Sequence, residues 1–172
     1  MSSFGIGAST LRREDLRLLT GQGMYSDNRS APGQTYAAFG RSPQAHADVD
    51  SIDGAQSRAM PGVVGVFTAQ YLLADKIRPV PTMLADRKGG ITNRDGTPFA
   101  EPGWFALATD RVRYEGEAVA IVIAETPFAA QDAAEAVIVS YRERAAIVEA
   151  DRADVRPAPQ LLDYADRDRA YD

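Results

Sequence analysis

The fold of this chain is decided by the stretch L107ATDRVRYEGEAVAIVIAETPFAAQDAAEAVIVSY141. Its centre, Ala118–Ala124, reads AVAIVIA and carries no polar side chain. A run this short and this rich in β-branched residues predicts a strand buried on both faces. Thr126 and Pro127 follow, and they suit the N-cap and the first position of a helix. The sequence therefore predicts a buried strand that leads directly into a capped helix.

A second strand is expected beyond this helix. The helix should run from Pro127 to about Ala136, and Val137–Tyr141 then has the composition of a strand. A parallel pair of strands needs a crossover of about a dozen residues, which the helix and its turn supply. No nucleophile, metal-ligand cluster or phosphate-binding loop lies in this unit, so it predicts a fold without predicting a chemistry.

Shorter elements are expected upstream. Val49–Phe67 loosely repeats the strand–helix–strand pattern, with its second strand in the interior of a sheet. Gly21 follows the first short helix as its C′ residue, which explains Gly21 and Gly23 without a phosphate-binding motif. The expected elements are helices over Glu14–Leu19, Asp53–Met60 and Thr68–Ala74, and strands over Gln34–Arg41, Ala47–Ile52 and Val63–Phe67.

Two regions differ from this regular pattern. Residues Ile77–Trp104 contain four prolines and four glycines and predict one long irregular loop. Loops of this length often contact a partner, and Trp104 and Phe105 are the expected buried anchors of that contact. The region from Glu149 onward is charged. The expected division is a domain over residues 1–150 and a charged tail or linker over residues 151–172, with Met1–Leu11 as an extended arm.

The composition of the 172 residues is that of a globular domain, with 45% hydrophobic and 25% charged residues. The absence of cysteine excludes disulfides, thiolate zinc sites, cysteine-held iron–sulfur clusters and cysteine nucleophiles within this chain. A net charge of −5 with scattered arginines disfavours nucleic-acid binding. No apolar window is long enough for a membrane span. No Sec-type secretion signal is evident. A cytoplasmic location is expected, and export together with a partner is the alternative.

The polar residues offer one candidate general base and one candidate nucleophile. His46 is the single histidine, with Asp48 and Asp50 nearby, and a general base needs such orienting partners. A structural or surface histidine is nevertheless the favoured interpretation. Ser42 lies in the tripeptide RSP and not in a nucleophile elbow of the GxSxG type. A serine hydrolase is therefore disfavoured.

Acidic residues can serve as metal ligands or as a catalytic pair. Asp48 and Asp50 alternate with apolar residues, so both are expected to face solvent at a strand edge. Asp151 and Asp154 lie in the polar C-terminal region without an oxygen-ligand loop. Arg111 and Arg113 are expected to form ion pairs with neighbouring strands, sharing one strand face with Glu115 and Glu117. The residues thus predict no catalytic, cofactor-binding or metal-binding position in this chain.

Four stretches taken together resemble a known family. In order, they closely resemble the N-terminal α/β-hammerhead domain in the molybdenum-binding large subunit of molybdenum hydroxylases, which include xanthine dehydrogenase, aldehyde oxidase and aerobic carbon monoxide dehydrogenase. The resemblance implies an α+β fold with a mixed sheet, short crossover helices and one long irregular loop. The stretches are Arg12–Asp27, Arg41–Asp53, Ala59–Thr68 and Leu107–Tyr141.

The chain departs from the family pattern at a few positions. Gln44 stands where histidine is common, and Asn28 replaces a second acid. Arg144 and Ala145 stand where leucine and proline usually follow the last strand. We interpret these departures as surface and turn differences. Because Met1 precedes the pattern by only a few residues, the start resembles the bacterial arrangement with a separate large subunit.

The resemblance implies an enzyme of which this chain is one scaffolding domain. Family members bind molybdopterin and oxidise aldehydes, N-heterocycles or carbon monoxide, and iron–sulfur clusters and FAD lie on partner subunits or domains. The implied partners are the downstream molybdopterin-binding domains and the iron–sulfur and flavin subunits. No family site residue has a counterpart here, so the isolated chain is expected to bind no cofactor and to be inactive. The alternative is a stand-alone, non-catalytic binding or interaction module with the same fold.

Overall fold

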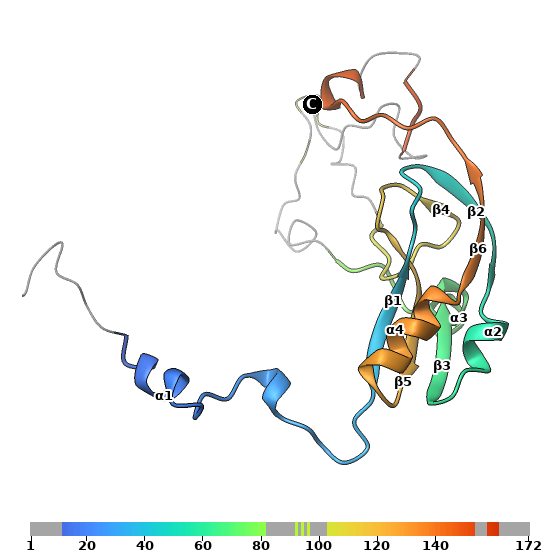
Figure 1. Ribbon diagram of the computed structural model, residues 1–172. Coiled ribbons are helices and arrows are strands. Elements are labelled where there is room, and N and C mark those ends of the chain that lie inside the picture. Colours follow the sequence, from blue (N-terminus) through green and yellow to red (C-terminus); the bar gives the residue numbers. More distant parts are fainter. Residues whose placement is uncertain are drawn as a thin grey trace, which may run out of the picture. The chain divides into compact units, whose positions relative to one another are not determined.

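The computed structural model describes residues 12–81, 92, 94, 96, 103–153 and 158–161. The chain divides into two compact units, Met1–Gln34 and Thr35–Asp172, and Figure 1 labels their elements. The arm expected over Met1–Leu11 and most of the long loop lie outside the described residues. The boundary expected at residue 150 stays a prediction.

The first unit contains the short helix α1 (Asp15–Leu19) and the 3-10 turn η1 (Ser26–Asn28). Gly21 follows α1 with a φ of +72°, a conformation that glycine adopts without strain. The amide of Gln22 donates to the carbonyl of Arg17 at 2.9 Å, as in a Schellman motif. The predicted helix and its termination by Gly21 are both confirmed.

The second unit contains two three-stranded sheets. Sheet A has the strand order β1-β5-β3, and sheet B has the order β4-β2-β6. Every pairing between these strands is antiparallel. The strands are β1 (Tyr36–Arg41), β2 (Ala47–Asp53), β3 (Val63–Thr68), β4 (Arg111–Val112), β5 (Ala118–Ala124) and β6 (Ile138–Glu143), and the helical elements are α2 (Ala55–Arg58), α3 (Ala69–Ala74), α4 (Pro127–Glu135) and the 3-10 turn η2 (Ala150–Arg152).

Each of the two strand–helix–strand units has one strand in sheet A and one strand in sheet B. β2–α2–β3 starts in sheet B and ends in sheet A, whereas β5–α4–β6 starts in sheet A and ends in sheet B. β3 therefore pairs with β5, and β2 pairs with β6. The α+β class and the short crossover helices are confirmed. The parallel pairing and the mixed sheet were wrong among the described strands, because each helix leads its chain into the other sheet.

The central strand β5 is confirmed at its predicted bounds, but β3 is not the interior strand we expected. It pairs with β5 alone among the described strands and lies at the edge of sheet A. Helix α4 lies in front of sheet A in Figure 1. Thr126 accepts a hydrogen bond from the amide of Ala129 at 3.1 Å, which confirms the predicted N-cap. On the sheet side, Ala133 packs in one cluster with Val122 of β5.

A β-bulge in β2 explains how two apolar residues of this strand reach the buried cluster of sheet B. The pairing with β6 shifts between Val49 and Ser51, so Asp50 is the additional residue. Val49 and Ile52 can then face the same side although they are an odd number of positions apart. Both pack against the buried cluster of sheet B, as predicted, and that cluster comprises Ala47, Ala108, Val112 and Val119.

Truncating the centre of β5 should destabilise the domain. Val122 is fully buried between sheet A and α4, so Val122→Ala should lower the free energy of unfolding by about 2 kcal/mol in urea titrations. Val64, on β3, is 62% exposed, and Val64→Ala is the matched control, with an expected change of about 0.5 kcal/mol or less. Equal losses for the two variants would contradict this packing.

Candidate functional site

The candidate base and nucleophile are both buried within the fold. His46 is 3% exposed, and its Nδ1 lies 2.7 Å from the carbonyl oxygen of Ala145, to which it donates. Its Nε2 is buried without a hydrogen-bond partner in the described part of the chain. Ser42 is buried too, and its hydroxyl accepts from the amide of Gln44 at 3.0 Å. Both side chains are buried, which supports the structural interpretation of His46.

The carboxylate of Asp48 is the centre of an arginine cluster. Its Oδ1 accepts hydrogen bonds from Nε of Arg144 at 2.7 Å and from Nε of Arg111 at 3.1 Å. Nη2 of Arg142 lies 3.4 Å from Oδ2. The Asp48 side chain is only 13% exposed. The expected solvent-facing position at a strand edge was wrong, because β2 is the central strand of sheet B and β4 and β6 flank it.

This cluster joins the three strands of sheet B through side chains. Asp48 lies on β2, Arg111 on β4 and Arg142 on β6, while Arg144 follows β6 directly. The hydrogen bond from Arg144 is the largest cause that lowers the pKa of Asp48, Arg111 adds to it, and together they outweigh the opposing effect of burial. A carboxylate held in its charged form by arginines is a poor proton acceptor. The arrangement is suited to stabilising the sheet rather than to catalysis.

The remaining charged candidates are also engaged in structural contacts. The predicted cross-strand ion pair of Arg111 is confirmed by its contact with Asp48. Arg113 lies beyond β4, and its Nε donates to the carbonyl of Leu161 at 3.2 Å. Glu117 accepts a hydrogen bond from the backbone amide of Arg113 at 2.6 Å. The described residues contain no group of three or more acidic or histidine side chains arranged to hold a metal ion.

Arg144 and Ala145 have roles that the sequence did not predict. Their departure from the family pattern predicts only surface or turn positions. Arg144 instead makes the shortest contact to Asp48, and Ala145 provides the carbonyl that binds His46. Their partners lie 96 and 99 positions earlier in the chain. No local signal marks such distant contacts.

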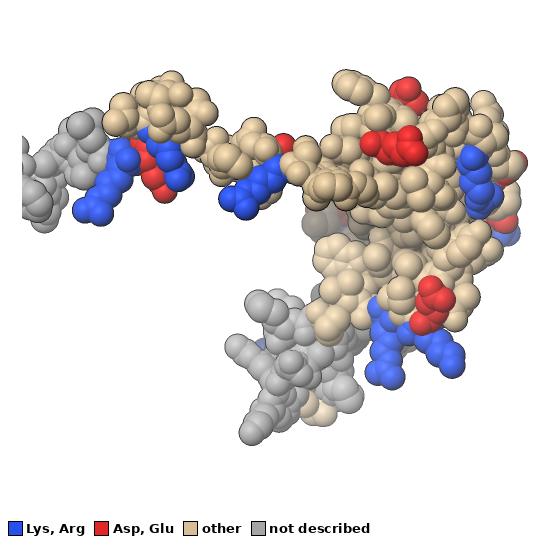
Figure 2. Space-filling model, turned by 90° about the horizontal axis from the view of Figure 1, so that it is seen from below, with Lys and Arg blue, Asp and Glu red and all other residues tan. Residues whose placement is uncertain are grey.

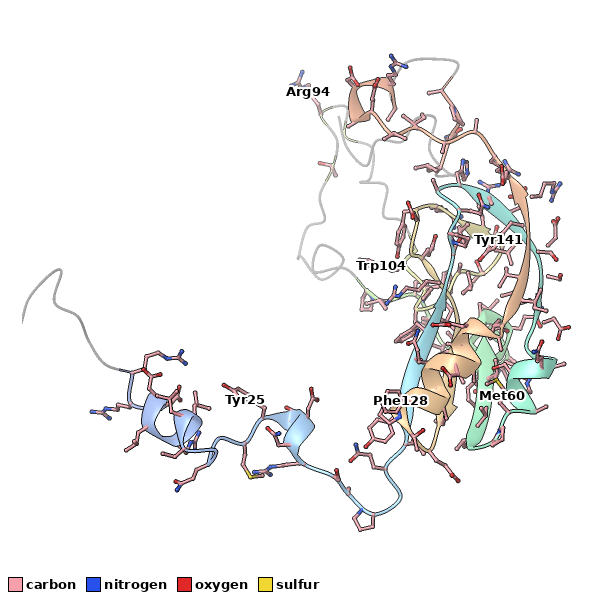
Figure 3. The ribbon with its side chains drawn as sticks, viewed as in Figure 1. Tyr25, Met60, Arg94, Trp104, Phe128 and Tyr141 are labelled. Carbon is pink, nitrogen blue, oxygen red and sulfur yellow. The ribbon has the colours of Figure 1, made fainter. Side chains whose placement is uncertain are left out.

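The end of the long loop is exposed. The amide of Val80 donates to the carbonyl of Trp104 at 2.7 Å, and Trp104 is 65% exposed (Figure 3). A cavity of about 260 Å³ lies beside it, lined by residues that include Phe105, Leu107 and Tyr114. Trp104 is thus not buried within this chain, and its burial against a partner stays a prediction. Asp151 is exposed in η2, and Asp154 lies outside the described residues.

The arginine cluster should make stability depend on pH. The folded-state pKa of Asp48 is below its usual 3.8, so its contribution is present above that value and is lost as pH falls through the lower, folded-state value. Asp48→Asn should lower the urea midpoint clearly at about pH 7 and much less at about pH 2 to 3. Asp50→Asn, which removes an exposed pair with Arg142, is the control with a small effect. An equal deficit for Asp48→Asn at both pH values would contradict the assignment.

Comparison with known proteins places this fold in a family. Residues 20–145 match the model described as the a/b hammerhead domain of aldehyde oxidase and xanthine dehydrogenase. The chain is 35% identical over 159 residues to the 6-hydroxypseudooxynicotine dehydrogenase complex subunit gamma of Paenarthrobacter nicotinovorans, covering 92% of this chain and 17% of the relative. It is 32% identical over 157 residues to the carbon monoxide dehydrogenase large chain of Afipia carboxidovorans. That match covers 91% of this chain and 17% of the relative.

A solved structure is similar as well. The crystal structure of the Cu,Mo-CO dehydrogenase matches with a TM-score of 0.74 at 32% identity, over 91% of this chain and 18% of that chain. The chain therefore spans less than a fifth of the length of these relatives. The matched part includes both sheets and the arginine cluster. The chain belongs to the aldehyde oxidase and xanthine dehydrogenase α/β-hammerhead family, as a domain of the molybdenum hydroxylase large-subunit type.

Proposed function

We propose that this chain is the N-terminal scaffolding domain in the large subunit of a molybdopterin-dependent hydroxylase or dehydrogenase. The family match over residues 20–145 carries this proposal. The complete enzyme oxidises an aldehyde, an N-heterocycle or carbon monoxide. The range of substrates named in the relatives, from carbon monoxide to nicotine and xanthine, supports a common domain whose role does not depend on the substrate.

The polar groups of the chain support a structural role. Asp48 is occupied by three arginines, and His46 and Ser42 are buried. The described residues therefore do not fit a molybdopterin site, and we assign no catalytic step to them. In this proposal the cofactor is bound by downstream domains, and the iron–sulfur clusters and FAD belong to partner subunits or domains.

The surface is consistent with protein partners. On the face shown in Figure 2, acidic and basic side chains occur in small groups of both signs, which does not favour a nucleic-acid partner. None of the helices in the described ranges is long and apolar enough to cross a membrane. We further propose that residues 151–172 link the domain to the downstream domains and that the complete enzyme is cytoplasmic.

Metal analysis tests the proposal. The complete protein should contain molybdenum and a pterin and oxidise a substrate of the family, whereas residues 1–172 expressed alone should contain neither and be inactive. The measurements are elemental analysis, pterin fluorescence after cofactor release, and dye-linked oxidation assays. Molybdenum bound to residues 1–172 alone would contradict the scaffolding role. A complete native protein without molybdenum would favour the stand-alone module.

A further inference from the structure

Among the described residues, helix α4 covers one face of sheet A. Alternate residues of a strand point to opposite faces. On β5, Val122 packs in the cluster beneath α4, so Ile121 and Ile123 point to the other face. They are only half-buried, although β5 is the central strand. We call this second surface the open face of sheet A.

The open face is apolar across all three strands. Phe39 of β1 and Phe67 of β3 are both direct partners of Ile121 in the sheet, so the three side chains form one row. Phe39 is 45% exposed and Phe67 is 38% exposed. The adjacent row consists of Ala37, Ile123 and Gly65, which contribute no polar side chain. A row of large apolar side chains at the centre of an antiparallel sheet is normally covered.

Two residues define the border of the open face. Tyr71 of α3 stacks edge-to-face on Phe67 with 5.5 Å between ring centres, and it is 47% exposed. The guanidinium of Arg41 lies 5.5 Å from the centre of the Phe39 ring. Nη1 of Arg41 donates to the carbonyl of Gly116. No carboxylate in the described residues forms an ion pair with Arg41, so the border offers one positive charge to an acidic group.

We propose that the open face is the surface on which the remainder of the large subunit packs, an inference that rests on the proposed function. Relatives that match this chain over 91–92% of its length use only 17–18% of their own length to do so. Most of their polypeptide thus lies outside this domain and is available to cover the face. The occupant is an apolar surface that carries a carboxylate opposite Arg41.

A second copy of this chain is a poorer occupant. The open face carries one cationic residue, Arg41, and no acidic residue among the members named above. Two copies packed through this face would place each guanidinium against apolar groups or against the other guanidinium. Burying a charge without a partner is unfavourable. Charge complementarity therefore favours a different surface of the large subunit.

Cysteine labelling tests the proposal directly, because residues 1–172 contain no native cysteine. Ala37→Cys places a thiol on the open face at an exposed position, and Gln131→Cys places the control thiol on an exposed position of α4. In residues 1–172 alone, a maleimide should label both. In the complete large subunit, labelling at position 37 should be lost and labelling at position 131 retained, as read by peptide mass spectrometry.

Each outcome has a distinct meaning. Equal labelling of the two positions in a molybdenum-containing large subunit would overturn the docking surface and leave the proposed function intact. Loss of labelling at position 37 in residues 1–172 alone, with a dimer by light scattering, would instead assign the face to a second copy and overturn the proposal. Hydroxyl-radical footprinting of Phe39 and Tyr71 in the unaltered protein should show the same protection and does not depend on a substitution.

Discussion

The pairing of β5 with both β1 and β3 is the constraint on which the domain depends. Val122 of β5 lies opposite Ala38 of β1 and opposite Val66 of β3. Val122 and Val66 belong to the apolar cluster beneath α4, and Ala38 packs against it. Because β5 is central, its backbone groups are satisfied on both sides. Helix α4 starts immediately after it and leads the chain to β6 in sheet B, while α2 leads from β2 in sheet B to β3 beside β5. β5 contributes Val119 to one buried cluster and Val122 to the other, so losing this strand would remove a core residue from both.

Sheet B is stabilised in a different way. Its strands are joined by apolar residues on one face and by the Asp48 cluster, whose arginines come from β4, from β6 and from just beyond β6. Breaking a partly buried cluster leaves charges without partners, which is costly. Asp48 and His46, the candidates for a catalytic role in the sequence, are therefore groups that connect segments distant in the chain. The fold thus gives Asp48 and His46 structural partners.

Local patterns predicted the elements better than their pairing. The apolar run of β5, the Thr126 cap and the termination of α1 at Gly21 depend on neighbouring residues, and all three are confirmed. The direction of pairing depends on where each crossover helix leads, which periodicity does not encode. The environment of Asp48 was missed for the same reason, since Arg111 and Arg144 lie 63 and 96 positions away. Residue patterns alone predicted a sheet and a long loop. The resemblance to the family identified the specific fold.

We propose that this domain supports an enzyme without taking part in its chemistry. The most direct test is the rate per bound molybdenum in the complete enzyme carrying His46→Asn. The variant should yield less assembled enzyme while kcat per molybdenum stays unchanged, because His46 is buried and bonded to Ala145. A general acid or base contributes about a hundredfold or more to the rate. A fall of that size in kcat per molybdenum would contradict a purely structural role of His46.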